Sequence, residues 1–219
     1  MFQQMLNASR AVLLHPSVAT FEEHERNDLG WALIYTAIAA VVSAVISAIR
    51  AVVVAPLAAQ QLNDLERQFE QQTGQPLPPF AAGLLGTGSI TAAIVGTLFG
   101  AIIGFLIYLG IVYLLGLLFG GTGAFGELAY DISLFSAPLT VINALISLIG
   151  IGPLVCVTGI VSIAIAIYNL YLTYLGIQAG MNLPGNKALL VILIPIIVVL
   201  LLCCGLFALI FLAFAGRAQ

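Results

Sequence analysis

The sequence predicts an all-α membrane protein, a polytopic bundle of about five transmembrane helices with short amphipathic helices at its amino-terminal end. Of its 219 residues, 62% are hydrophobic and only 7% are charged, and the mean hydropathy is +1.16. Soluble domains carry about a quarter charged residues, because the outside of a globule in water must be polar. Six Lys or Arg and nine Asp or Glu cannot cover a chain of this length. Lipid must therefore be the solvent for most of its surface.

Residues 1–28 are expected to form a polar tail at the membrane interface. Apolar side chains recur there at helical spacing, at Phe2, Met5, Leu6, Val12 and Leu13. A short amphipathic helix of this kind lies in the interface rather than crossing the bilayer. Pro16 ends this helix, and Thr20 followed by Glu23 fits a capping box that opens a second short helix.

A membrane domain is predicted over residues 29–216, because five apolar runs each reach the roughly 20 residues that one crossing needs. These runs cover about 30–56, 89–118, 127–150, 153–180 and 187–216. A polar loop at 57–88 separates the first two runs. It opens with a charged stretch that is compatible with a helix and then breaks at Pro76, Pro78 and Pro79.

The second span carries a glycine every four residues, at Gly96, Gly100 and Gly104. This spacing leaves one face of the helix without side chains over more than two turns. Another helix can approach such a face closely, so these glycines are predicted to be a helix-packing surface.

The usual parts of membrane enzymes are missing from the predicted spans. His15 and His24 both precede the first span, so no histidine is available there for a serine dyad, a bis-histidine haem or a zinc site. We therefore expect no enzymatic activity, no cofactor and no metal. The few cations are scattered and the net charge is −3, which also argues against nucleic acid as a partner.

Two acidic residues stand four apart at the start of the third span, so Glu127 and Asp131 share one face of that helix. Acidic groups near a membrane boundary cost free energy unless they are hydrated or paired, which makes the two a candidate proton or cation site. Helix capping and attraction to the positive end of the helix explain them more simply.

A polar aromatic stretch lies toward the end of the fourth span, at Tyr168, Asn169, Tyr171 and Tyr174. The tyrosines can form an interfacial belt or line a cavity between helices, and the belt is the simpler interpretation. Asn169 lies well inside the span and is expected to hydrogen-bond across helices.

Taken together, the chain resembles the Yip family of small membrane proteins, named for interaction with Ypt and Rab GTPases, and specifically its prokaryotic members. Three features carry the resemblance over most of the chain: the amphipathic tail with Pro16, the stretch GGTGAFGELAYD from Gly120 to Asp131 entering a span with Pro138, and LPGNKALLVILIP from Leu183 to Pro195.

The resemblance implies a five-helix bundle in a prokaryotic cytoplasmic membrane with its amino-terminal tail in the cytoplasm. Counting positive charges does not orient the chain, because three cations fall on each side of the predicted membrane. The long amino-terminal region that the eukaryotic relatives often carry is missing here. We therefore do not carry a GTPase partner over to this chain.

These features favour a non-enzymatic membrane scaffold or accessory subunit. Its expected partners are the lipid bilayer and other membrane proteins or a second copy of the chain. The alternative is a transporter or channel for small solutes or ions that uses Glu127, Asp131 and Asn169. The scaffold hypothesis depends on the glycine face of the second span and on the missing active-site sets.

Overall fold

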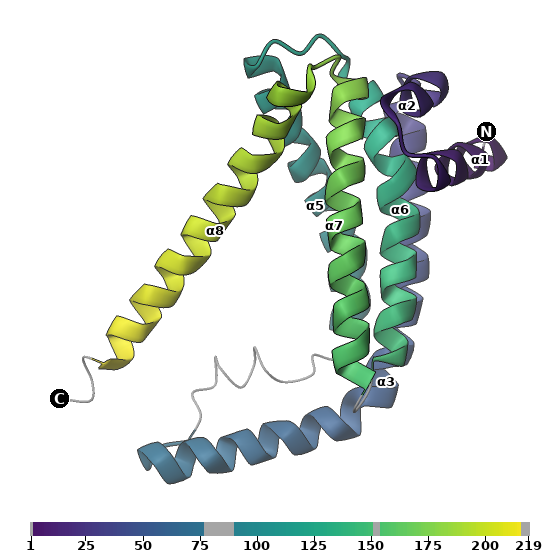
Figure 1. Ribbon diagram of the computed structural model, residues 1–219. Coiled ribbons are helices and arrows are strands. Elements are labelled where there is room, and N and C mark those ends of the chain that lie inside the picture. The colour runs from purple at the N-terminus through teal and green to yellow at the C-terminus, as the bar shows by residue number, and fades with distance from the viewer. Residues whose placement is uncertain (1, 77–89, 151–153, 216–219) are drawn as a thin grey trace.

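The computed structural model describes residues 2–76, 90–150 and 154–215, and all of its regular elements are helices (Figure 1). In chain order these are α1 (Phe2–Leu14), α2 (Val18–His24), α3 (Leu29–Thr73), α5 (Ile90–Leu118), α6 (Phe125–Ile149), α7 (Val155–Gly180) and α8 (Gly185–Ala215). Among the described residues, five helices are long and apolar enough to cross a membrane, and they are α3, α5, α6, α7 and α8. The predicted all-α bundle with five spans is thereby confirmed.

The first spanning helix continues well beyond the membrane. α3 contains Pro56 and ends only at Thr73, where Gly74 adopts a left-handed backbone with φ 67° and its N–H bonds the carbonyl oxygen of Glu70 at 2.8 Å. One proline removes one hydrogen bond but need not end a helix whose following residues are good helix formers. The first part of the expected 57–88 loop is thus a helical extension, which runs crosswise to the spans in Figure 1. Residues 77–88 lie outside the described residues, as do the predicted span boundaries at 89, 153 and 216.

The two amino-terminal helices form as expected, but the cap of α2 differs. Its N-cap is Ser17, whose side chain accepts a hydrogen bond from the Thr20 N–H at 3.1 Å. Thr20 instead donates its hydroxyl proton to the His15 carbonyl at 2.9 Å. Ser17 has an extended backbone directly after Pro16 and is the first hydroxyl to reach the free N–H groups of the new helix. The capping box at Thr20 and Glu23 is therefore wrong.

The buried core is gathered at one end of the bundle, which we call the closed end. It comprises α1, α2, the first halves of α3 and α6, the second halves of α5 and α7 and the first turns of α8 (Figure 1). Its fully buried large side chains come from six helices and include Val12, Phe21, Leu109, Leu128, Phe135, Leu172 and Val191. α3 packs against both α5 and α6, and α6 packs against α7. The helices therefore bury most of their packed side chains at the closed end.

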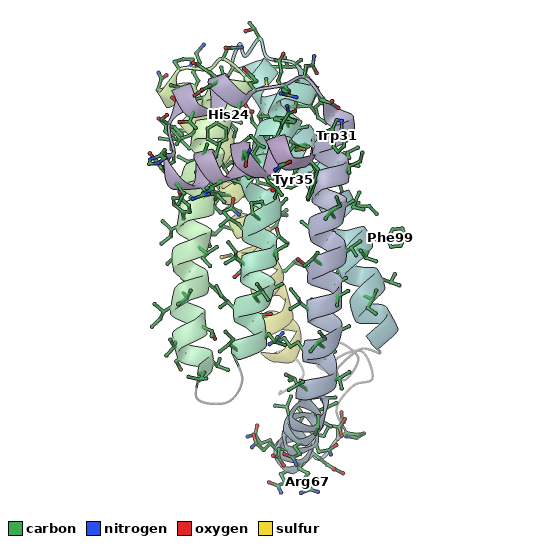
Figure 2. The ribbon with its side chains drawn as sticks, turned by 90° about the vertical axis from the view of Figure 1, so that its right-hand side faces the viewer. His24, Trp31, Tyr35, Arg67 and Phe99 are labelled. Carbon is green, nitrogen blue, oxygen red and sulfur yellow. The ribbon has the colours of Figure 1, made fainter. Side chains whose placement is uncertain are left out.

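The opposite half of the spans, the open end, has little core. Every side chain from Ile196 to Leu206 is exposed, as are most of those from Leu154 to Leu170. Figure 1 shows α8 diverging from α7 along its length, and Phe99 on α5 points away from the bundle in Figure 2. Exposed apolar side chains cost nothing against lipid tails, which are as apolar as leucine.

Candidate functional site

Acidic side chains meet at the closed end, where α2 packs on α7 and the residue that ends α2, Glu25, comes near the start of α6. Asp131 on α6 has no exposed surface, and neither of its carboxylate oxygens has a hydrogen-bond partner among the described residues. A buried carboxylate without a donor is costly unless its charge is compensated. Asp131 is therefore the acidic residue at the closed end that most needs a proton or an oppositely charged group to compensate its charge.

Glu127 stands one turn before Asp131 and has a different role. Its Oε2 accepts a hydrogen bond from the backbone N–H of Ala124 at 2.8 Å. The side chain thus closes the first turn of α6 in the manner of a capping box. The capping interpretation describes Glu127, but it does not describe Asp131, which faces the interior.

Glu25, the C-cap residue of α2, completes the acidic cluster that we define as Glu25, Glu127 and Asp131. Its Oε1 is buried without a hydrogen-bond partner in the described part of the chain. Burial raises the pKa of the Glu25 carboxyl above its ordinary value, and the negative charges of Glu127 and Glu22 raise this pKa further. Neighbouring carboxylates with so few hydrogen-bond donors favour the uptake of a proton. No group of three or more His, Cys, Asp or Glu within the described residues is arranged to hold a metal ion.

A glycine allows α7 to close over this cluster. A Cβ atom on Gly180 would lie 2.9 Å from the Cα of Leu128 and 3.0 Å from Oδ2 of Asp131. A Cβ on Gly123 would overlap the carbonyl oxygen of Gly180. The backbones of α6 and α7 therefore approach as closely as they do only because both positions lack side chains.

The remaining polar residues of the predicted site lie in separate places. Asn169 lines a cavity of about 350 Å³ between α5, α6 and α7, and no hydrogen bond joins its side chain to another described residue. Tyr168 donates its hydroxyl proton to the Leu13 carbonyl at 2.6 Å and so ties α7 to α1. The Tyr171 side chain is exposed, and the Tyr174 hydroxyl lies against Gly185. Neither Glu127 nor Asp131 lines the Asn169 cavity.

The glycine face of the second span is open. Gly96, Gly100 and Gly104 are all exposed, and a Cβ on any of them would meet no described atom within 4 Å. This face lies on the open end of α5. No described part of the chain packs on this face, so the prediction of a helix-packing surface stays a prediction.

Sequence reasoning missed Glu25 and Gly180. Glu25 lies in the polar tail expected over residues 1–28, and nothing local shows that the end of α2 comes near the start of α6. Gly180 did have a signal, since Gly176 and Gly180 repeat the spacing of four that singled out the α5 glycines. Gly176 also lies at a helix contact, where its Cβ would be 3.4 Å from a ring carbon of Phe135.

One protein-family model matches nearly the whole length of the chain. The model of the Yip1 domain matches residues 10–207, which run from α1 into α8 and include the acidic cluster. No curated protein and no solved structure matches the chain. The match spans nearly the full length and agrees with the five-helix architecture. The chain therefore belongs to the Yip1 domain family of integral membrane proteins.

Proposed function

We propose that this protein is a non-enzymatic membrane scaffold or accessory subunit that acts through helix contacts with other membrane proteins or with a second copy of itself. The observation that carries this proposal is the open end of the bundle, where the backbone of α5 is bare at Gly96, Gly100 and Gly104.

Close approach of helix backbones is a main source of association energy between helices in lipid, because apolar burial contributes nothing there. At the closed end, Gly123 and Gly180 are already used for the close approach of the start of α6 to the end of α7. The α5 glycines present the same kind of surface without an occupant from the described chain. A helix of another protein, or α5 of a second copy, would gain on this face the packing that α7 gains on α6.

The test is crosslinking of the tagged chain in its native membrane, followed by mild-detergent purification and mass spectrometry of what comes with it. The test variant is Gly100→Ile, which places a branched side chain at the centre of the face. The matched control is Gly159→Ile on α7, because Gly159 is also exposed and also has no described atom within 4 Å of its Cβ position.

A partner captured in stoichiometric amount, lost from Gly100→Ile and kept by Gly159→Ile, is the expected result. Recovery of the chain alone from the membrane would contradict a scaffold role. A partner that both variants retain equally would move the contact away from the α5 face.

We further propose that the closed end faces the cytoplasm, in a prokaryotic cytoplasmic membrane. The family resemblance supports this orientation. The exposed positions Glu22 and Gln71 lie on opposite sides of the first span. In intact cells, a membrane-impermeant thiol reagent should label Gln71→Cys and spare Glu22→Cys, and the reverse pattern would invert the orientation.

Transport is the second candidate function, and the observation that favours it is the buried, unpartnered carboxylate of Asp131. Ionisable groups of this kind often mark ion or proton pathways in membrane proteins. Reconstituted vesicles test it directly: ion or solute flux that Asp131→Asn and Glu127→Gln both abolish would support transport. Absence of flux across a broad solute panel would leave the acidic cluster with a structural role only.

A further inference from the structure

Helix α1 lies crosswise to the spans with one face against the bundle. Met5, Ala8 and Val12 on that face are almost completely buried. Its two edges differ in chemistry, since Phe2 and Leu6 lie along one edge and Gln4 and Asn7 along the other. Figure 2 shows α1 passing between His24 of α2 and Tyr35 of α3. Each edge of α1 borders a cavity.

The cavity on the apolar edge has a volume of about 300 Å³. Phe2 and Leu6 form its rim, and the spanning parts of α3 and α6 form its walls, including Ile38, Ala39, Val42 and Pro138. Its one polar side chain is that of Tyr35, whose hydroxyl is held by Ser9 at 2.9 Å. Several of its lining residues, Leu6, Ile38 and Val42 among them, are exposed at the surface of the spans. This groove therefore opens to the acyl chains of the bilayer.

The cavity on the polar edge has a volume of about 240 Å³ and is lined by Gln4, Asn7, Ala8, Glu23, His24, Arg26 and Tyr130. Charges of both signs face it, the guanidinium of Arg26 and the carboxylate of Glu23. Arg26 also donates a hydrogen bond to the side-chain oxygen of Gln4 at 3.4 Å, which places an amide beside the guanidinium. Guanidinium and amide N–H groups are donors for a phosphate, and a carboxylate accepts from an ammonium.

We propose that α1 is the centre of a binding site for one ethanolamine phospholipid, with an acyl chain in the apolar groove and the headgroup in the polar cavity. The Arg26 guanidinium donates hydrogen bonds to the phosphate, and the Glu23 carboxylate accepts a hydrogen bond from the primary ammonium. The acidic cluster and Asp28 lie at the same end of the bundle, so this end favours a headgroup that carries a cation over a purely anionic one. A choline headgroup has a cation but no N–H to donate to Glu23.

A second groove supplies an internal control. It has a volume of about 340 Å³, lies between α5 and α8, and is lined by apolar residues that include Leu114, Pro195 and Val198. No charged side chain lines it. It has the size and apolar walls of the first groove. A lipid chain in this groove would contact apolar side chains only.

The experiment is native mass spectrometry of the full-length, delipidated chain titrated with ethanolamine, choline and glycerol phospholipids of identical acyl chains. One ethanolamine lipid should be retained per chain, in preference to the other two. Arg26→Gln should weaken this binding by about tenfold, which corresponds to one hydrogen bond to a charged group. Val42→Phe, which fills the apolar groove, should release the lipid, and Val198→Phe in the control groove should not.

Equal retention of the three headgroups, with equal loss from Val42→Phe and Val198→Phe, would show annular lipid only and overturn the proposal. Preference for the glycerol phospholipid would overturn the assignment of an ethanolamine headgroup. If Val42→Phe fails to fold, Arg26→Gln on the protein surface still decides the matter. The site lies at the closed end, away from the α5 glycines, so its failure is distinguishable from failure of the scaffold proposal.

Discussion

The closed end of the bundle and the α5 face at its open end use glycine in opposite ways. At the closed end, Gly123 and Gly180 lie where a Cβ atom would collide with the backbone of a neighbouring segment. At the open end, a Cβ on Gly96, Gly100 or Gly104 would meet no described atom within 4 Å. All five residues belong to or border apolar helices of the same kind. Helical spacing alone therefore does not tell which glycines are at an internal contact.

The difference shows what holds this protein together in lipid. Apolar side chains gain nothing by leaving lipid for another helix, so the helices stay together where backbones approach closely and where polar groups bond. The closed end has both, including the Ser9 hydroxyl bonded to that of Tyr35 and Tyr168 bonded to the Leu13 carbonyl. At the open end the main close approach among the described residues is that of Gly150, at the end of α6, to Thr158 of α7, and α8 diverges from the other spans (Figure 1).

The largest expected effect is the difference in stability between a substitution at a glycine in a helix contact and one at a glycine without a neighbour. Gly180→Val should destabilise the chain by about 3 kcal/mol, because its Cβ meets the Leu128 backbone, which cannot rotate away. Gly100→Val should change stability by no more than about 0.5 kcal/mol. Thermal unfolding of the purified variants in mild detergent measures both. Equal destabilisation by the two would remove the distinction between the ends.

Asp131→Asn should stabilise the closed end. The amide keeps the shape of the side chain and cannot acquire a negative charge beside Glu25 and Glu127. An unsatisfied buried polar group costs about 1 to 3 kcal/mol and a charged one more, so the expected gain is about 1 to 2 kcal/mol. The same unfolding assay at neutral pH detects it. A loss of stability would instead mean that the ionised carboxylate has a compensating group.

Tyr168→Phe tests the attachment of α1. The substitution deletes a hydrogen bond of 2.6 Å to the Leu13 carbonyl and leaves that carbonyl without its donor, at an expected cost of about 1 kcal/mol. The effect should be local, with faster backbone hydrogen exchange in α1 and unchanged exchange in α8. Tyr171→Phe is the matched control, since the Tyr171 side chain is exposed. Uniform changes across the chain would argue against a specific tie.

The smallest effect concerns pH. Because the folded protein raises the pKa of Glu25, it binds this proton more tightly than the unfolded chain does. The associated stability is fully present below the ordinary pKa of a glutamate and is lost as the pH rises through the raised value. Glu25→Gln should flatten this part of the curve of stability against pH. Glu70→Gln on the exposed extension of α3 should leave it unchanged, and an unaltered curve for Glu25→Gln would contradict the assignment.

The candidate site could be predicted only in part. Glu127 and Asp131 are visible in the sequence as acids at the start of a span, and Glu127 caps the helix there. Their separation from Asn169 is not visible, because it depends on how α6 and α7 pack. Asn169 lies well before the end of α7 at Gly180, whereas Glu127 and Asp131 lie in the first turns of α6. The place of Glu25 in the acidic cluster cannot be predicted for a similar reason. Glu127 and Asp131 belong to α6, which begins a hundred residues later in the chain.

The sequence by itself determined the solvent, the helices and the family. Long apolar runs with few charges admit only membrane helices, and turn residues set the ends of four of the five spans to within a few positions. The exception is α3, which continues to Thr73. Tertiary structure alone decided which half of the bundle packs, which glycines lie at a contact between helices and which carboxylate is buried. The physical reason is that several spans are apolar on all sides, since lipid does not require an outward polar face. The periodic pattern that marks the inner face of a soluble helix is therefore absent, and only contact between helices defines an interior.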